Sequence, residues 1–286
     1  MQANDHPLML GRGPRHLVAA WVGFIVVVGC QTPPASPFEP ARLDPLAGLA
    51  IVDLSHSFDD HTIYWPTGDR FTHKADTVGM QPGGYYYEAY SFCAAEHGGT
   101  HLDAPIHFAA HRWTADAIPL DRLIGPAILV DVARNAAAAR DYLVSVADLE
   151  AWEREHGAIP DGAIVLLRTG HGAHWSDPER YLGTAERGAE AVKKLHFPGL
   201  DPDAARWLVG ERRIHAIGLD TPSIDAGPST AFLAHRILLD ANIPVFENVA
   251  GLEQLPAFGF SVVALPMKIG AGSGGPLRIV ALVPRR

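Results

Sequence analysis

The feature that most constrains this chain is the segment His97-Gly-Gly-Thr-His101-Leu-Asp103-Ala-Pro-Ile-His107. A helix is unfavourable here, because paired glycines and β-branched Thr100 are poor helix formers and Pro105 breaks a helix. We therefore predict an extended segment, in which alternate side chains face the same side. Four polar side chains then point one way: His97, His101, Asp103 and His107.

A straight strand could not bring these side chains to one ion. At about 3.3 Å per residue, His97 and Asp103 would lie about 20 Å apart, whereas metal–ligand bonds measure about 2.0–2.2 Å. The chain must bend, and Gly98-Gly99 and Ala104-Pro105 are the points where it can. Imidazole and carboxylate ligands suit zinc, manganese or ferrous iron. A histidine-rich surface loop without function is the alternative for any single histidine, but the set of four favours a metal site.

The N-terminal segment predicts export. Arg12 and Arg15 precede an apolar run over residues 17–29, which is shorter than the roughly 20 residues of a membrane-spanning helix and suits a signal peptide. The run ends at Gly29-Cys30 and resembles a bacterial lipobox. We expect a lipoprotein-type signal over residues 1–29, lipidation of Cys30, a tether over 30–44, and a periplasmic or cell-envelope protein that meets the membrane only through its lipid anchor. An ordinary secretory signal with an incidental cysteine is the alternative.

Residues 45–286 read as one globular domain, with 48% hydrophobic and 19% charged residues in the whole chain. The net charge is -9 and no run of Lys or Arg occurs, which argues against a nucleic-acid partner. Cys93 follows Phe92 and is expected to pack as a small apolar residue.

Strand and helix patterns alternate along the second half of the chain, which predicts an α/β domain with a partly parallel sheet. The aromatic first third suggests antiparallel strands as well, so we expect a mixed sheet. The expected strands cover residues 49–54, 85–92, 127–132, 163–167, 214–219, 244–247, 260–265 and 277–283. The expected helices cover 146–156, capped by Ser145, then 204–211 and 231–242.

Residues 270–275 satisfy the G-x-G-x-x-G pattern of dinucleotide sites. That interpretation requires a following helix and an acidic residue about 20 positions later, but Pro276 and an expected strand follow. Ser273 also fails as a nucleophile, because Ala271 stands where G-x-S-x-G requires glycine. We therefore exclude both functions for this loop.

The segment 97–107 resembles the motif H-x-G-T-H-x-D-A-P-x-H of the metal-dependent cyclase family, which includes bacterial kynurenine formamidases and isatin hydrolases. Further similarities lie at residues 53–56, 65–66, 166–170, 218–225 and 265–269. The resemblance implies a swivelling β/β/α-type fold, homo-oligomers, and metal-assisted hydrolysis of an amide-type C–N bond. The rival function is a non-catalytic metal- or solute-binding lipoprotein of the cell envelope.

The resemblance also implies the ligand set. His97, His101 and Asp103 would be joined by His235 and Glu247 to hold one or two divalent ions, zinc first and manganese second. Alone, His235 would be interpreted as a core histidine on a helical face, and Glu247 as an unusual charge after a short apolar strand.

His107 is the remaining member of the series and is expected to act as the general base, because imidazole titrates near neutral pH. The alternative is that His107 binds the metal. Trp65 and Phe108 are expected to contact a small amide, imide or lactone substrate. Other aromatic residues could line the same pocket or simply pack: Tyr64, Phe71, Tyr85 and Tyr86.

Overall fold

The computed structural model describes residues 46–285. The expected signal segment, Cys30 and the tether lie outside these residues. Among the described residues, no helix is both long and apolar enough to cross a membrane.

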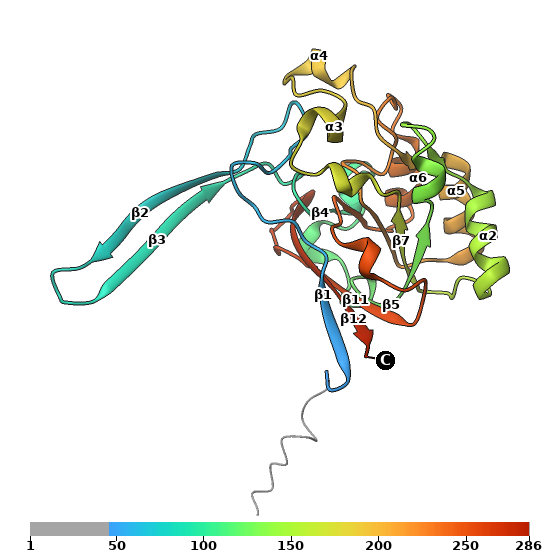
Figure 1. The fold of residues 1–286 in the computed structure, drawn as a ribbon, viewed down its shortest axis with the longest axis horizontal. Coiled ribbons are helices and arrows are strands. Elements are labelled where there is room, and N and C mark those ends of the chain that lie inside the picture. Colours follow the sequence, from blue (N-terminus) through green and yellow to red (C-terminus); the bar gives the residue numbers. More distant parts are fainter. Residues whose placement is uncertain (1–45, 286) are drawn as a thin grey trace, which may run out of the picture. The chain divides into compact units, whose positions relative to one another are not determined.

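One mixed sheet of eight strands forms the framework (Figure 1). Its order is β1-β12-β11-β5-β7-β9-β10-β4, and β4 also pairs with β12, so the sheet closes on itself. Strands β5, β7, β9 and β10 run parallel, whereas the other pairings are antiparallel. The bounds are β1 Leu49–Asp53, β4 His101–Asp103, β5 Ile124–Asp131, β7 Ile164–Arg168, β9 Ala216–Leu219, β10 Val245–Glu247, β11 Phe260–Pro266 and β12 Gly274–Pro284. The predicted α/β fold with a mixed sheet is confirmed.

The parallel strands are buried on both faces, which explains their continuous apolar sequences. In β7, Val165 and Leu167 pack into one core cluster, while Ile164 and Leu166 pack into a second. The first cluster lies under three helices, α2 Val146–His156, α5 Pro202–Trp207 and α6 Leu233–Asp240. The remaining helices are α1 Ala133–Ala136, α3 Pro178–Leu182 and α4 Ala189–Val192, of which α3 and α4 pack at a third, smaller cluster. A π-helical turn, η6 Leu208–Arg212, extends α5, and a small sheet pairs β6 Leu143–Val144 with β8 Gly199–Leu200.

The predicted cap of α2 is present. The Ser145 hydroxyl accepts a hydrogen bond from the Asp148 backbone N–H, and the Asp148 carboxylate accepts one from the Ser145 backbone N–H. This reciprocal pair satisfies N–H groups that the first helical turn leaves without partners. The prediction of this helix is therefore confirmed at both ends, including the stop at Gly157.

A separate hairpin of β2 Thr72–Met80 and β3 Tyr86–Cys93 extends away from the sheet (Figure 1). We did not predict β2, because its sequence lacks the apolar alternation of a half-buried strand. The prediction that Cys93 packs as a buried apolar residue is wrong, because β3 is not covered and Cys93 is exposed. Tyr85 and Tyr86 are exposed at the hairpin for the same reason and are not among the residues that line the cavity over the candidate site.

Candidate metal centre

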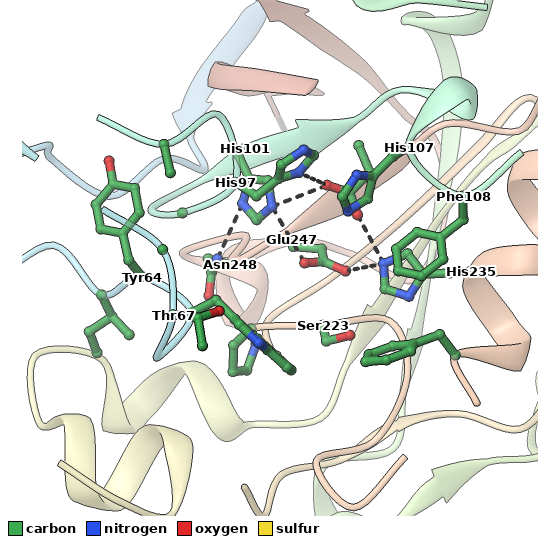
Figure 2. Close-up of a pocket in the computed structure, with 18 residues that line it drawn as sticks. Tyr64, Thr67, His97, His101, His107, Phe108, Ser223, His235, Glu247 and Asn248 are labelled. Atoms are coloured by element: carbon green, nitrogen blue, oxygen red, sulfur yellow. Dashed lines mark hydrogen bonds and ion pairs between the residues drawn. The ribbon is translucent and has the colours of Figure 1, made fainter. Parts of the chain in front are cut away.

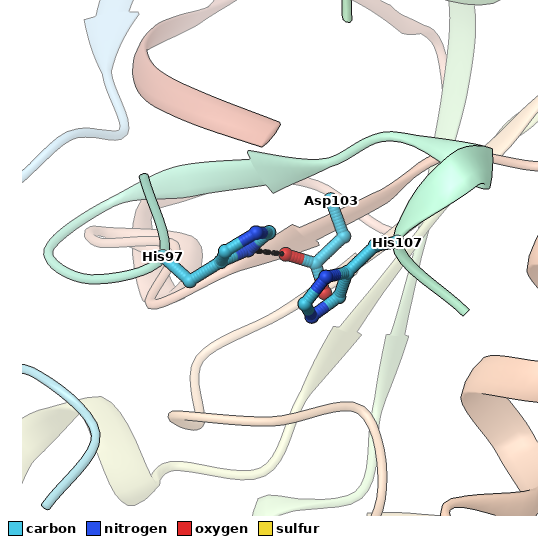
Figure 3. A group of neighbouring side chains, drawn as sticks. All are labelled: His97, Asp103 and His107. Carbon is cyan, nitrogen blue, oxygen red and sulfur yellow. Dashed lines mark hydrogen bonds and ion pairs between the residues drawn. The ribbon is translucent and has the colours of Figure 1, made fainter. Parts of the chain in front are cut away.

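The segment 97–107 bends where its glycines permit it. Gly99 adopts a φ of +60°, and the Nδ1 atom of His97 lies 2.7 Å from the Oδ1 atom of Asp103 (Figure 3). Gly98 lies against Tyr64, where an added Cβ would meet the tyrosine ring at 2.0 Å. Beyond Asp103, Pro105 opens a 3₁₀ turn, η2 Pro105–His107. The predicted bend is confirmed at both points.

His101 and Glu247 are brought together by strand pairing. In the antiparallel pair of β4 and β10, His101 lies directly opposite Glu247. The Nε2 atom of His101 lies 3.2 Å from Oδ1 of Asp103 and 3.5 Å from Oε2 of Glu247. Leu102 between the two polar residues of β4 points to the other face and joins the core.

His235 reaches the same cluster from α6. Its Nε2 atom lies 3.0 Å from Oδ2 of Asp103 and 3.2 Å from Oε1 of Glu247, and its Nδ1 atom lies 2.7 Å from Oδ2 of Asp225. His235 is buried, as a core histidine would be, but all its polar contacts are carboxylates. The structure thus brings together five side chains that lie up to 150 positions apart in the sequence, namely His97, His101, Asp103, His235 and Glu247.

His107 lies beside this cluster. Its ring is close to the rings of His97 and Phe108 (Figure 2). Burial lowers the pKa of His107 to about 4, although Asp103 acts in the opposite direction. Possible ligand atoms of His97, Asp103 and His107 also lie within 4.8 Å of one another, so both interpretations of His107, base or ligand, fit its position.

The histidines and carboxylates of the cluster shift one another's ionisation. Burial favours neutral Asp103, but the three neighbouring histidines outweigh it and hold the pKa of Asp103 well below its usual value. Burial and the Asp103 charge raise the pKa of Glu247. Burial lowers the pKa of His235, but its carboxylate partners outweigh this and raise it well above the usual value. In the ion-free cluster, protons on His101 and His235 therefore balance the carboxylate charges, and a divalent cation would take the place of those protons.

The direction of the hydrogen bonds indicates that the cluster fits a divalent metal. The Nδ1 atom of His101 lies 3.0 Å from the carbonyl oxygen of Gly99, which can only accept, so Nδ1 carries the hydrogen. His235 donates from Nδ1 to the Asp225 carboxylate in the same way. The Nε2 atoms of both histidines face the carboxylate oxygens of Asp103 and Glu247, so their lone pairs would point to one place once a metal displaces the protons. Lone pairs converging in this way are the donor set of a divalent cation.

A cavity of about 330 Å³ opens over the cluster (Figure 2). One wall is aromatic: the ring of Phe232 lies 5.4 Å from that of Phe108 and 6.4 Å from that of Trp65. Tyr64 also lines the cavity. Trp65 and Phe108, which the sequence predicts to contact substrate, line this cavity. Phe71 instead packs against other aromatic rings, 5.9 Å from Phe92.

Two residues that support the site were not assigned a role from the sequence. Asp225 accepts the Nδ1–H of His235, and Asn248 donates from its side-chain amide to the Gly99 carbonyl at 2.6 Å. Asp225 ends a similarity that the sequence revealed, and Asn248 follows Glu247 directly. Their contacts depend on how α6 and the glycine bend approach one another, which a linear pattern does not specify.

Comparison with known proteins decides the family. The Cyclase family model matches residues 52–226, which is more than half of the chain and includes the bent segment. The chain belongs to the cyclase family. His235 and Glu247 lie beyond the matched residues, so their place in the site depends on the distances given above.

Relatives and solved structures similar to this chain are consistent with that assignment. It is 34% identical to isatin hydrolase of Roseibium aggregatum, over 66% of this chain and 73% of that protein. It is 30% identical to kynurenine formamidase of Salinibacter ruber, over 81% of this chain and 97% of that protein. The structure of isatin hydrolase A from Ralstonia solanacearum matches with a TM-score of 0.76 and 31% identity, covering 88% of this chain and all of that one.

Proposed function

We propose that this protein hydrolyses the C–N bond of a small aromatic amide, either open-chain or cyclic, at a divalent metal centre. The observation that carries the proposal is a buried cluster of histidines and carboxylates at the base of an aromatic cavity. Relatives named isatin hydrolase and kynurenine formamidase support the reaction type. These relatives are named as enzymes, which favours hydrolysis over the non-catalytic binding lipoprotein.

The proposed ligands are His97, His101, Asp103, His235 and Glu247. A divalent ion held there would lower the pKa of a bound water toward about 7 and polarise the substrate carbonyl. Asp103 directs Oδ1 toward His97 and His101 and Oδ2 toward His235, so its two oxygens could serve two ions. Zinc is the first choice and manganese the second, because both accept imidazole together with carboxylate.

The proposed base is His107. With its pKa lowered to about 4 by burial, the imidazole is neutral near pH 7 and able to accept a proton from the attacking water. The same ring can then donate that proton to the leaving nitrogen. The aromatic wall of Trp65, Phe108 and Phe232 would hold a planar ring and restrict the entry of bulk water.

The test is turnover of isatin, N-formylkynurenine and a bicyclic lactam by the full-length protein loaded with zinc or manganese. Hydrolysis of any one of them, abolished by a chelator and restored by the metal, is the expected result. Bound metal without turnover of any of the three would favour the binding protein instead.

A homo-oligomer is also part of the proposal. One face of the β2–β3 hairpin carries Tyr86, Tyr90 and Phe92, all exposed, and a lone two-stranded hairpin is marginally stable in water. The Glu88 carboxylate on the same face accepts hydrogen bonds from the Tyr86 and Tyr90 hydroxyls. A second copy of the chain would cover the aromatic rings of this face, in agreement with the oligomers that the family resemblance implies.

The proposed location is the cell envelope, with the chain anchored through lipidated Cys30. This rests on the sequence of residues 1–44 alone. Cys30→Ala should move the protein from the membrane fraction to the soluble fraction. An unchanged distribution would instead support an ordinary secretory signal.

A further inference from the structure

The glycine-rich loop before β12 lies directly against His97. A Cβ on Gly274 would meet the Leu102 carbonyl oxygen at 2.4 Å and the Cε1 atom of His97 at 2.6 Å. Because one of these neighbours is backbone, no side chain fits at this position. Glycine at position 274 therefore lets the backbone approach the His97 ring closely. This contact accounts for a glycine in residues 270–275, for which a dinucleotide-binding role was excluded above.

Ser273 in this loop connects His97 to a carboxylate. Its Oγ atom lies 2.6 Å from Oε2 of Glu96 and 2.9 Å from Nε2 of His97. The backbone N–H of Ser273 donates to the same Glu96 oxygen at 2.9 Å. Glu96, Ser273 and His97 therefore form one hydrogen-bonded chain that ends at the metal centre.

The direction of this chain follows from the donors available. A hydroxyl has one hydrogen, and an ionised carboxylate can only accept. Ser273 therefore donates to Glu96 and must accept from His97, which places the imidazole hydrogen on Nε2. The Nδ1 lone pair of the neutral ring then faces Oδ1 of Asp103, 2.7 Å away. Without Glu96 the hydroxyl could donate to Nε2 equally well, and the hydrogen would move to Nδ1.

We infer that Glu96 and Ser273 are positioning residues that select the His97 tautomer with a free Nδ1 and so present this atom to the metal. The inference rests on the proposed metal centre and deepens it. His101 and His235 need no such intermediary, because the nearest partner of each outer nitrogen only accepts. For His101 this partner is the Gly99 carbonyl at 3.0 Å, nearer than the Asn248 amide nitrogen at 3.4 Å, and for His235 it is the Asp225 carboxylate. The outer partner of His97 is the Ser273 hydroxyl, which can either donate or accept a hydrogen bond. Glu96 fixes its direction by taking the hydroxyl hydrogen.

The first test compares Ser273→Ala with wild type in the full-length protein. The variant keeps the backbone bond from residue 273 to Glu96 and loses only the hydroxyl. We expect the zinc dissociation constant to rise about 10- to 100-fold, the usual effect of losing an outer partner of a metal ligand. Ser91→Ala is the matched control, because Ser91 also donates to a carboxylate, Asp76, but on the exposed hairpin. Its zinc affinity should equal that of wild type.

A second pair of variants tests whether Glu96 acts as a hydrogen-bond acceptor or through its negative charge. Glu96→Gln keeps a carbonyl oxygen that can accept from Ser273, so zinc affinity should remain close to wild type. Glu96→Ala removes the acceptor and should weaken zinc binding as Ser273→Ala does. In the double variant Glu96→Ala/Ser273→Ala, the two losses should not add, because both act through one chain.

The tautomer itself is measured by ¹⁵N NMR of the zinc-loaded, histidine-labelled protein, with the His97 signals assigned by their loss in His97→Asn. We expect hydrogen on Nε2 of His97 in wild type. Hydrogen on Nδ1, or unchanged zinc affinity in Ser273→Ala, would overturn the relay and leave the proposed hydrolase intact. Failure of the wild-type protein to bind zinc or manganese would overturn the proposed function and the relay with it.

Discussion

The imidazole ring of His107 stacks on that of His97, with ring centroids 3.8 Å apart and planes inclined by 19°. His107 thus meets the cluster through the face of its ring, whereas His97 points a nitrogen at Asp103. This arrangement places a half-buried imidazole, with its pKa lowered to about 4, next to the proposed metal without requiring it as a ligand.

His107→Ala should therefore separate chemistry from metal binding. We expect the turnover number to fall about 100- to 10,000-fold, the usual contribution of a general acid–base, with the metal content unchanged. Turnover and metal content are to be measured on the same sample, with His61→Ala, an exposed histidine, as control. Loss of metal together with activity would show that His107 is a ligand instead.

Asp225→Asn should weaken metal binding without a direct contact to the metal. Asp225 accepts the Nδ1–H of His235 at 2.7 Å, whereas an asparagine can turn its amide N–H₂ toward Nδ1 and favour the tautomer with hydrogen on Nε2. We expect a 10- to 100-fold weaker zinc affinity, measured by competition with a chelator. Asp240→Asn is the control, because Asp240 lies on the same helix but pairs with Arg112 at the surface. Equal affinities in the two variants would refute the role of Asp225.

Trp65→Ala should weaken the binding of aromatic substrates more than that of aliphatic ones. Trp65 lines the cavity beside Phe232, and an aromatic pair contributes about 0.5–1.5 kcal/mol. We expect KM for an aromatic amide to rise roughly 2- to 12-fold, with little change for a small aliphatic amide cleaved by the same enzyme. Steady-state kinetics on both substrates tests this. An equal rise for both would mean that Trp65 supports the fold rather than the substrate.

His171 should make the folded protein less stable in mild acid. Burial lowers its pKa from 6.5 to about 4, against the opposing effect of its hydrogen bond to the Tyr181 carbonyl at 2.6 Å. Between these pH values the unfolded chain binds a proton that the folded chain does not, so stability is complete above pH 6.5 and is lost as the pH falls toward 4. The full difference is about 3 kcal/mol.

Urea unfolding of wild type and His171→Asn from pH 7.5 to pH 5 measures this contribution. The free energy of unfolding of the variant should be lower than that of wild type at pH 7.5, and this difference should become smaller as the pH falls. His111→Asn, at an exposed position, should give a curve parallel to wild type. If the difference in unfolding free energy between wild type and His171→Asn did not change with pH, His171 would not be the source of the pH dependence.

The exposed face of the hairpin should determine the oligomeric state. The double variant Tyr86→Ser/Phe92→Ser removes two aromatic rings from this face, and we expect light scattering after size exclusion to show a monomer with unchanged metal content. Tyr87→Ser is the matched control, because Tyr87 is equally exposed but points to the opposite face of β3. A monomeric wild type, or an unchanged mass in the double variant, would exclude this interface.

Much of the framework could be predicted from the sequence, because buried parallel strands are continuous apolar runs and α2 carries its cap in Ser145. The hairpin strand β2 could not, since neither of its faces is buried and its sequence therefore shows no alternation. Within the site, the bend of residues 97–107 followed from bond lengths and glycines. The role of Ser273 did not, because it depends on contact between residues 176 positions apart, and local pattern carries no information about such contacts.

The pairing of β4 with both β10 and β12 also bears on the order of events during synthesis. Residues 101–103 carry two of the proposed ligands, but their sheet partners are residues 245–247 and 274–276. A nascent chain that has exposed the histidine segment therefore lacks both flanking strands until nearly the whole domain has been translated. We expect metal binding to be a late step in folding. An incomplete ligand set, with less selectivity between metals, would then not bind an ion during synthesis.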